Sequence, residues 1–311
     1  MNKFILIIMC VMGSMILSQC SSDAPPKAGT VRLVDPKARD LMAKAQEKEK
    51  AGKIGKAIKR YETLVEECPL SLEAPQAQFR IAELHEQLQS PLDAFDAYQK
   101  FIERYPNSSR YKQALLKQKD IAYGAATGKL TNKVLWMFEV RMDSSNVIKW
   151  LNSVCDNAPF APSAPESLSI LGKYLIERDR VDEAITCYQK LVDNYPTSAF
   201  APLAQLEIAD LYRNEQTGGS RNHANIMRAQ EAYEDYLQRY TQHSGQAKKG
   251  LSDVRRLIVQ QKLETGEYYL NRMKDRDAAI FSFEEVIHHA ETNPEAATKA
   301  RAYLKQMGVK R

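Results

Sequence analysis

The chain has 311 residues, of which 44% are hydrophobic and 27% charged, so it is long enough to bury a substantial core. Its formal net charge is +5, and because 44 basic residues are interleaved with 39 acidic ones, the sequence shows no broad basic stripe that would indicate nucleic acid. With only 13 glycines and 13 prolines, the composition favours helix.

Residues 1–20 predict a bacterial lipoprotein signal peptide. Lys3 precedes an apolar run from Phe4 to Leu17, which is shorter than the ~18 residues that usually span a bilayer. The segment ends in Leu17-Ser18-Gln19-Cys20, which resembles a lipobox, so we expect cleavage before Cys20 and its lipidation with acyl chains such as palmitate. Gln19 departs from the usual Gly, Ala or Ser, and a plain secretory signal or an N-terminal anchor is the alternative.

Residues 21–34 predict a flexible tether between this signal and the body of the protein. The segment begins with polar residues and contains Pro25, Pro26 and Gly29, a composition typical of a linker. Ser21, directly after the cysteine, resembles the outer-membrane form of the lipoprotein sorting signal.

Two blocks, 35–125 and 161–311, contain an internal repeat. Residues 57–84 align without a gap with residues 184–211, and 14 of the 28 aligned positions are identical. A shorter unit, Ala-x3-aromatic-x7-Pro, starts at Ala57, Ala94 and Ala184, and weaker copies centre on Val147, Ala229 and Ala279. In a helix pair, the small residue lies where two backbones approach, the aromatic fills the gap on the same face, and the proline ends the second helix.

These spacings resemble the consensus of tetratricopeptide repeats (TPR), and Leu171-Gly172 matches the Leu-Gly pair of the first helix of such a repeat. The sequence therefore predicts an all-α TPR superhelix of about six helix pairs. Residues 126–160 are expected to form an irregular insert and a divergent repeat, with a short strand-like or irregular segment around Val134–Val140 before the next helix.

No pattern in the chain predicts catalysis, a cofactor or a metal site. Gly124-Ala125-Ala126-Thr127-Gly128-Lys129 is one residue too short for a phosphate-binding loop, and none of the five histidines has metal-ligand spacing. Cys68, Cys155 and Cys187 are interpreted as small buried hydrophobic residues, with a Cys155–Cys187 bridge as the alternative. We therefore expect a binding protein and not an enzyme.

The first helices of stacked pairs line a concave surface, so their outward stripe is the candidate partner-binding groove. The candidate groove residues are Arg39, Met42, Gln46 and Glu49 in the first unit, Gln76, Phe79, Glu83 and Glu86 in the second, and Leu203, Leu206, Asp210 and Arg213 in the unit near Pro202. The apolar members suggest a site for an extended peptide or another protein. The alternative is that they pack between long helices.

The whole arrangement resembles the TPR lipoproteins of the outer-membrane β-barrel assembly machinery, the BamD-like family. The residues that carry this resemblance are Cys20, Tyr61-x2-Leu64-Val65 with Pro69, Ala74-Pro75-x-Ala77-Gln78, Ala94-Phe95-x-Ala97-Tyr98 with Tyr105-Pro106, Leu263-Glu264-x2-Glu267-Tyr268-Tyr269, and Ala278-Ala279-Ile280-x2-Phe283. Members of that family usually have five repeats, whereas the segment 126–160 adds an irregular unit here.

The resemblance implies a scaffold anchored by lipid to the bacterial outer membrane on its periplasmic face. Its partners would be other subunits of the β-barrel assembly machinery and unfolded outer-membrane proteins, and not nucleic acid. The alternative is a periplasmic TPR adaptor that coordinates cell-envelope or peptidoglycan machinery.

Overall fold

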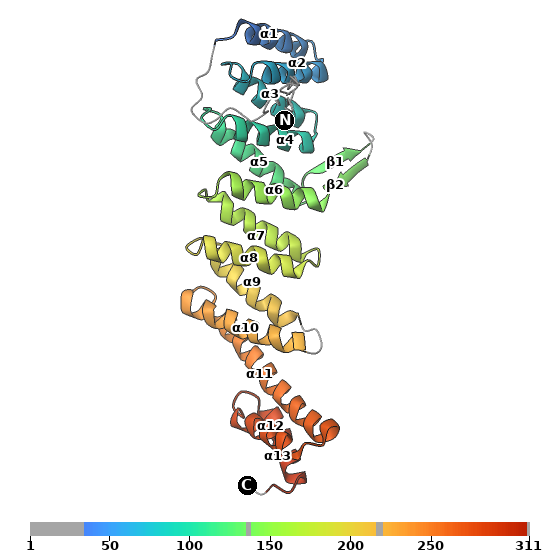
Figure 1. Cartoon of the computed structure of the whole chain (residues 1–311), viewed down its shortest axis with the longest axis vertical. Helices are drawn as coiled ribbons and strands as arrows, with labels where there is room; N and C mark the ends of the chain where they lie inside the picture. Colours follow the sequence, from blue (N-terminus) through green and yellow to red (C-terminus); the bar gives the residue numbers. More distant parts are fainter. Residues whose placement is uncertain (1–33, 135–137, 216–219, 310–311) are drawn as a thin grey trace, which may run out of the picture.

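A computed structural model describes residues 34–134, 138–215 and 220–309, and within these ranges the chain forms thirteen α-helices, one π-helical segment and a two-stranded sheet (Figure 1). In chain order the elements are α1 (Pro36–Lys50), α2 (Ile54–Glu67), α3 (Ala74–Gln87), α4 (Pro91–Arg104), α5 (Tyr111–Ala126), β1 (Thr131–Val134), β2 (Phe138–Arg141), α6 (Ser144–Asn157), α7 (Ser163–Ile176), α8 (Val181–Asn194), α9 (Ala201–Asn214), α10 (Ser220–Arg239), α11 (Ser244–Tyr268), η1 (Tyr269–Met273), α12 (Arg276–His288) and α13 (Pro294–Gln306). The expected signal peptide, Cys20 and residues 21–33 of the tether lie outside the described residues.

The helices stack in chain order into one elongated column, with α1 at one end and α13 at the other (Figure 1). Each helix packs mainly on the helices that precede and follow it, which is the contact pattern of a repeat array. The first twelve helices form six pairs, from α1–α2 to α11–α12, and α13 covers the last pair. This arrangement confirms the predicted TPR superhelix of about six helix pairs.

Local sequence sets the helix starts. Pro36, Pro91 and Pro294 are the first residues of their helices, where the missing amide hydrogen costs nothing. The side chain of Asp35 accepts a hydrogen bond from Lys37 N at 2.8 Å, and Asn293 accepts one from Ala296 N at 3.1 Å. These caps satisfy amide hydrogens that have no partner inside the helix.

The core repeats the small-plus-aromatic pattern of the sequence. The small residues that begin the motif and the aromatics four positions later are all buried: Ala57 and Tyr61, Ala94 and Tyr98, Ala184 and Tyr188, Ala229 and Tyr233, Ala279 and Phe283. In the third pair, where the motif is weakest, Val147 and Leu151 of α6 occupy the same buried positions. The motif therefore marks the surfaces on which successive helices pack.

The 127-residue offset in the sequence also preserves a polar contact inside the core. Gln78 of α3 donates from Nε2 to Ala97 O at 3.0 Å, and Gln205 of α9 donates to Ala232 O at 3.2 Å. Each glutamine is only 4% exposed and bonds to the second helix of its own pair. A buried amide that satisfies a carbonyl fixes the rotation of one helix against the other.

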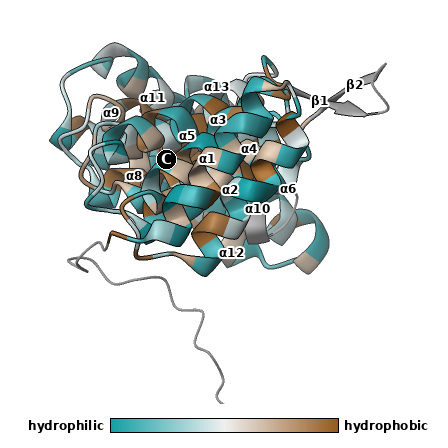
Figure 2. Cartoon of the chain, turned by 90° about the horizontal axis from the view of Figure 1, so that it is seen from above, coloured by the Kyte–Doolittle hydropathy of each residue, from teal (hydrophilic) through white to brown (hydrophobic). Residues whose placement is uncertain are grey.

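A β-hairpin interrupts the third helix pair between α5 and α6. Its strands are antiparallel, with Thr131 opposite Arg141 and Val134 opposite Phe138. The hairpin projects to one side of the stacked helices (Figure 1), and in the view along the column the outer faces of the helices are largely hydrophilic (Figure 2). Because α6 still packs on α5 and α7, the insertion leaves the order of the stack unchanged.

The apolar core is divided near the C-terminal end. One cluster of buried side chains extends from Ala38 to Val254, and a second, smaller cluster extends from Val259 to Leu304. The long helix α11 contributes to both clusters and continues into η1. In the part of the chain that the structure covers, no helix combines the length and the apolar composition needed to cross a membrane.

Candidate partner-binding groove

Several of the predicted groove residues come together between the first two helix pairs. Met42 of α1 and Gln76 and Glu83 of α3 line one surface cavity of about 320 Å³. The full lining is Met42, Gln46, Glu49, Lys50, Tyr61, Gln76, Arg80, Glu83 and Arg110. Arg39, the remaining predicted residue of α1, is outside this lining and forms an ion pair with Glu73 at 3.5 Å.

Phe79 is not on the groove surface, which corrects the orientation expected from the sequence. Its side chain is 0% exposed and makes edge-on ring contacts with Tyr98 at 5.5 Å and Phe101 at 5.3 Å, measured between centroids. The guanidinium of Arg110 covers the ring at 4.8 Å from its centroid. The start of α5 therefore closes over a position that helical periodicity alone placed facing the groove.

Leu206 needs the same correction, because the 127-residue offset makes it the counterpart of Phe79. Leu206 is 3% exposed and belongs to the core. Leu203, the counterpart of Gln76, is 48% exposed on α9. In both repeats, therefore, the earlier position of the stripe (Gln76 or Leu203) is exposed and the later position (Phe79 or Leu206) is buried.

A network of ion pairs forms the floor of the cavity. Arg80 binds Glu49 of the preceding pair through Nη2 at 2.5 Å and Glu83 through Nη1 at 2.7 Å. Tyr61 donates its hydroxyl to Glu49 Oε2 at 2.9 Å, and Arg110 approaches Glu83 at 4.0 Å. The charge-assisted bond between Glu49 and Arg80 connects α1 with α3, and Arg110, just before α5, adds a longer contact to the network.

The network shifts the ionisation of its members. The hydrogen bond from Arg80, supported by the one from Tyr61, lowers the pKa of Glu49 below its ordinary value. Burial, with the nearby Glu49 carboxylate, raises the pKa of the Tyr61 hydroxyl, and the two carboxylates raise the pKa of Arg80. Glu49, Tyr61 and Arg80 therefore keep their usual charge state at neutral pH.

Glu49 and Glu83 were predicted from the sequence as groove residues, whereas Arg80 and Arg110 were not. The Arg80-x-x-Glu83 spacing, which places both side chains on one helix face, was the available signal for Arg80. Arg110 precedes the first residue of α5, and no periodicity predicts its contact with Phe79.

The C-terminal block carries a related network. Arg213 binds Asp210 at 3.0 Å on α9 and approaches Asp253 of α11 at 3.8 Å. Tyr233 of α10 donates its hydroxyl to Asp210. Both blocks therefore place an arginine and acidic residues on the first helices, and a second-helix tyrosine bonds one of the acids.

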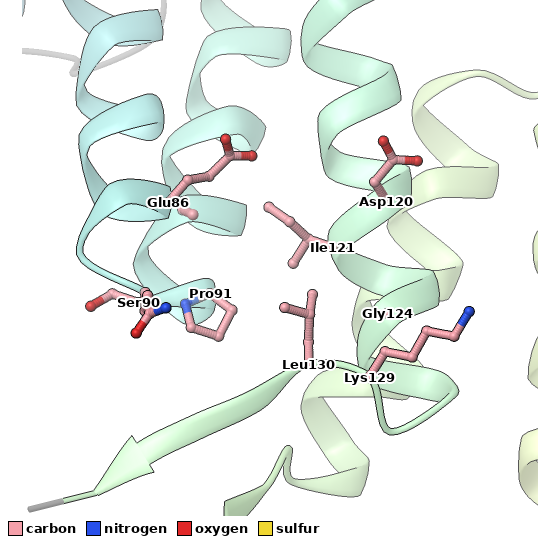
Figure 3. A pocket seen from close by; sticks show the side chains of 10 residues that line it. Glu86, Ser90, Pro91, Asp120, Ile121, Gly124, Lys129 and Leu130 are labelled. Atoms are coloured by element: carbon pink, nitrogen blue, oxygen red, sulfur yellow. The ribbon is translucent and has the colours of Figure 1, made fainter. Parts of the chain in front are cut away.

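A second and larger cavity, of about 630 Å³, lies where α3, α4 and α5 meet the loop before β1 (Figure 3). Ile121 and Leu130 point toward each other across its centre, and Glu86 and Asp120 lie on its rim. A methyl group on Gly124 would stand 2.7 Å from Leu130 Cδ1, so the absence of a side chain at Gly124 leaves the space that the Leu130 side chain occupies. The cavity combines apolar side chains with charged ones of both signs, since Lys129 also lines it and Lys117 pairs with Glu86 at 2.9 Å.

The three described cysteines have free, buried thiols. Cys187 donates to Leu168 O at 3.3 Å, and Cys155 lies 3.7 Å from the Tyr195 hydroxyl. Burial raises the pKa of Cys187 to about 12. The structure thus confirms the interpretation of the three cysteines as small buried residues. The alternative Cys155–Cys187 bridge is not formed. Within the described residues, no group of three His, Cys, Asp or Glu side chains is arranged to hold a metal ion.

Comparisons with known proteins agree with the fold. Two tetratricopeptide-repeat family models match the chain, at residues 42–109 and 166–198. No curated protein matches it in sequence.

Solved structures of repeat proteins are similar to the chain at low sequence identity. The yeast Tom70 structure is 18% identical, covers 81% of this chain and 44% of its own, and has a TM-score of 0.32. The structure described as the functional characterization of Pseudomonas aeruginosa pilF is 15% identical, covers 86% and 98%, and has a TM-score of 0.28. MamA from Desulfovibrio magneticus RS-1 is 13% identical, covers 67% and 100%, and has a TM-score of 0.27.

At TM-scores below 0.5 these superpositions do not define a shared overall shape. The assignment rests on the two family models and on the six stacked helix pairs. TPR proteins generally act as non-catalytic scaffolds that bind other proteins. The chain has the tetratricopeptide-repeat fold, and residues 42–109 and 166–198 match models of that repeat family.

Proposed function

We propose that this protein is a scaffold, anchored by lipid at the periplasmic face of the bacterial outer membrane, that binds partner subunits and client proteins during β-barrel assembly. The observation that carries its binding role is the cavity between α1 and α3. The assignment to β-barrel assembly is supported by the resemblance of Cys20 and of the repeat motifs to the TPR lipoproteins of that machinery.

The lining of the cavity suits a polypeptide segment. Met42 is half-buried and offers a flexible apolar surface, while Gln46 and Gln76 are exposed and can bond to an extended backbone. The charged floor is already paired, because Arg80 binds both Glu49 and Glu83. A segment that carries both charges could exchange these ion pairs for its own without leaving a buried charge alone.

The binding role is tested with matched glutamines on one helix. Gln76 and Gln87 are both exposed on α3, but only Gln76 lines the cavity. We expect Gln76→Ala combined with Met42→Ala to weaken partner capture about tenfold, and Gln87→Ala combined with Met227→Ala, another exposed methionine, to leave it unchanged. If both double variants capture the partner equally well and have equal melting temperatures, the cavity is not part of the binding site.

The identity of the partners is tested by affinity capture from detergent-solubilised envelopes. Recovery of β-barrel assembly subunits supports the proposal, whereas recovery of peptidoglycan synthases would favour the alternative adaptor. Depletion of the protein provides a separate readout, since the abundance of β-barrel outer-membrane proteins should fall. If barrel abundance is unchanged, the assembly role is wrong even when the cavity binds a protein.

The anchor is tested by metabolic labelling with a fatty-acid analogue. We expect Cys20→Ala to lose the label and to release the protein from the outer-membrane fraction. Cys10→Ala is the matched control, because Cys10 lies within the expected signal peptide and should leave labelling unchanged. Label that persists in Cys20→Ala would contradict lipidation at this residue.

A further inference from the structure

The net charge of the chain is concentrated in one short segment. Residues 50–60 contain five basic residues and no acidic residue. They are Lys50, Lys53, Lys56, Lys59 and Arg60, called here the basic face. Outside this segment the chain has 39 basic and 39 acidic residues, so the whole formal charge of +5 resides in the basic face.

All five side chains of the basic face are exposed at the end of α1 and along the first half of α2. Because a helix turns about 100° per residue, those on α2 lie within roughly 120° of one another, opposite the buried Ala57, Ile58 and Tyr61. No acidic side chain among the described residues forms an ion pair with them, whereas Lys44 and Lys48, just before the segment, are each paired. The basic face is therefore a positive surface without direct ion pairs among the described residues, and the Glu47 carboxylate acts on Lys53 only at longer range.

Local stability does not account for this arrangement. The first turn of α2 has no acidic residue and its last turn no basic one, while Glu66 and Glu67 stand at its C-terminal end. This order opposes the helix dipole, which favours acids at the start and bases at the end. Gly52 and Gly55 add open space beside the lysines, since a methyl group on either would touch nothing within 4 Å.

The position of the basic face in the column favours a membrane surface as its ligand. It belongs to the first helix pair, at the end of the column opposite α13 (Figure 1). Fifteen residues separate Cys20 from Pro36, and an extended chain of that length reaches about 50 Å at most. Four of the five cations are lysines, whose flexible, hydrated charges suit a fluid layer of headgroups better than a fixed bidentate partner.

We propose that the basic face binds anionic phospholipid headgroups and holds the first helix pair against the membrane. The proposal rests on the proposed lipid anchor, which brings the fold close to a bilayer. Such contact would direct the column from α3 onward away from the headgroups. Lys50, which also lines the cavity between α1 and α3, would then lie at the border between the membrane-facing surface and that cavity.

The test compares the binding of the full processed chain to two kinds of vesicle, one of phosphatidylcholine alone and one with about 25% phosphatidylglycerol. The quantity measured is the ratio of the two partition coefficients, because binding through the anchor contributes equally to both. One lysine near an anionic surface contributes roughly fivefold to binding, so Lys53→Gln, Lys56→Gln and Lys59→Gln together should lower the ratio at least tenfold. High salt should lower the ratio for the unaltered chain.

The matched control removes three exposed, unpaired cations of α11 through Lys248→Gln, Lys249→Gln and Arg256→Gln, which should change the ratio less than twofold. An equal fall in this control would overturn the proposal, because attraction would then depend on charge anywhere in the chain. A ratio near one for the unaltered chain would also overturn it, and an acidic protein segment would then be the better candidate ligand of the basic face. Weak binding to neutral vesicles with a retained ratio would instead contradict the anchor and leave this proposal standing.

Discussion

Gly172 of α7 lies so close to the ring of Tyr188 on α8 that a methyl group on Gly172 would stand 2.3 Å from Tyr188 Cε1. The same contact recurs twice on α11, where Gly250 meets Tyr233 and Gly266 meets Phe283. Since real Cβ atoms do not approach other atoms this closely, each glycine is required by the aromatic of the adjacent helix. The contact sets how closely two helices of the array approach.

We therefore expect Gly172→Ala to destabilise the protein although alanine is the better helix former. Displacing the buried Tyr188 ring should cost about 1–3 kcal/mol, which exceeds the gain of about 1 kcal/mol in helix propensity. Gly55→Ala is the control, because its methyl group would touch nothing within 4 Å and should stabilise by up to about 1 kcal/mol. Urea unfolding of both variants gives the comparison, and stabilisation by Gly172→Ala would contradict the packing account.

Phe79→Ala should act as a core truncation. Because the ring is fully buried against Tyr98 and Phe101, the expected loss is about 3–5 kcal/mol of unfolding free energy. Phe281→Ala, which truncates a phenylalanine that is 67% exposed on α12, should cost less than about 1 kcal/mol. A fall in partner capture by Phe79→Ala at unchanged stability would instead restore Phe79 to the groove.

The Glu49–Arg80 contact predicts a pH dependence of stability. Because the folded pKa of Glu49 is lowered, its contribution is fully present above its ordinary value of 4.5 and is lost as the pH falls through the folded pKa. The contribution should be about 1 kcal/mol, since Arg80 is partly exposed and its charge is screened.

Glu49→Gln should accordingly flatten the acid limb of a plot of melting temperature against pH. Glu62→Gln, at an exposed carboxylate on α2, should leave that limb unchanged. Identical acid limbs for Glu49→Gln and the unaltered protein would show that the contact adds nothing to stability.

The cysteines predict a simple chemical result. Buried thiols react slowly, and the raised pKa of Cys187, about 12, leaves almost no thiolate at pH 8. Alkylation of Cys68, Cys155 and Cys187 should therefore be slow in the native protein and complete in denaturant without a reductant. Peptide mass spectrometry identifies each site, and a reductant requirement at Cys155 and Cys187 would reveal a bridge between them.

Sequence patterns were sufficient for the fold because the contacts that define it recur. The match of Gln78 with Gln205, for example, reflects a buried hydrogen bond that both helix pairs make. A motif of small and aromatic residues predicts a helix pair because each pair must bury the same two surfaces against its neighbour. The repeat at Val147 and Leu151, where the motif is weak, was still recognisable from its spacing.

The groove was predicted less well, because its surface depends on contacts between pairs. Met42, Gln76 and Glu83 share the cavity as their helical positions indicated. Phe79 has the same periodicity but is covered by Arg110, a residue 31 positions later whose location depends on the turn before α5. Helical periodicity describes one helix, so it cannot show which positions the next repeat will cover. Whether these residues bind a partner stays a prediction.

The division of the core within α11 has a mechanical consequence. Between Val254 and Val259 the helix passes from the long apolar cluster to the short C-terminal one, and α12 and α13 are held mainly by the short cluster. A tensile load applied through the C-terminus would therefore detach α12 and α13 before it disturbed the larger body. The array would lose its last module under force while the first five helix pairs stayed assembled.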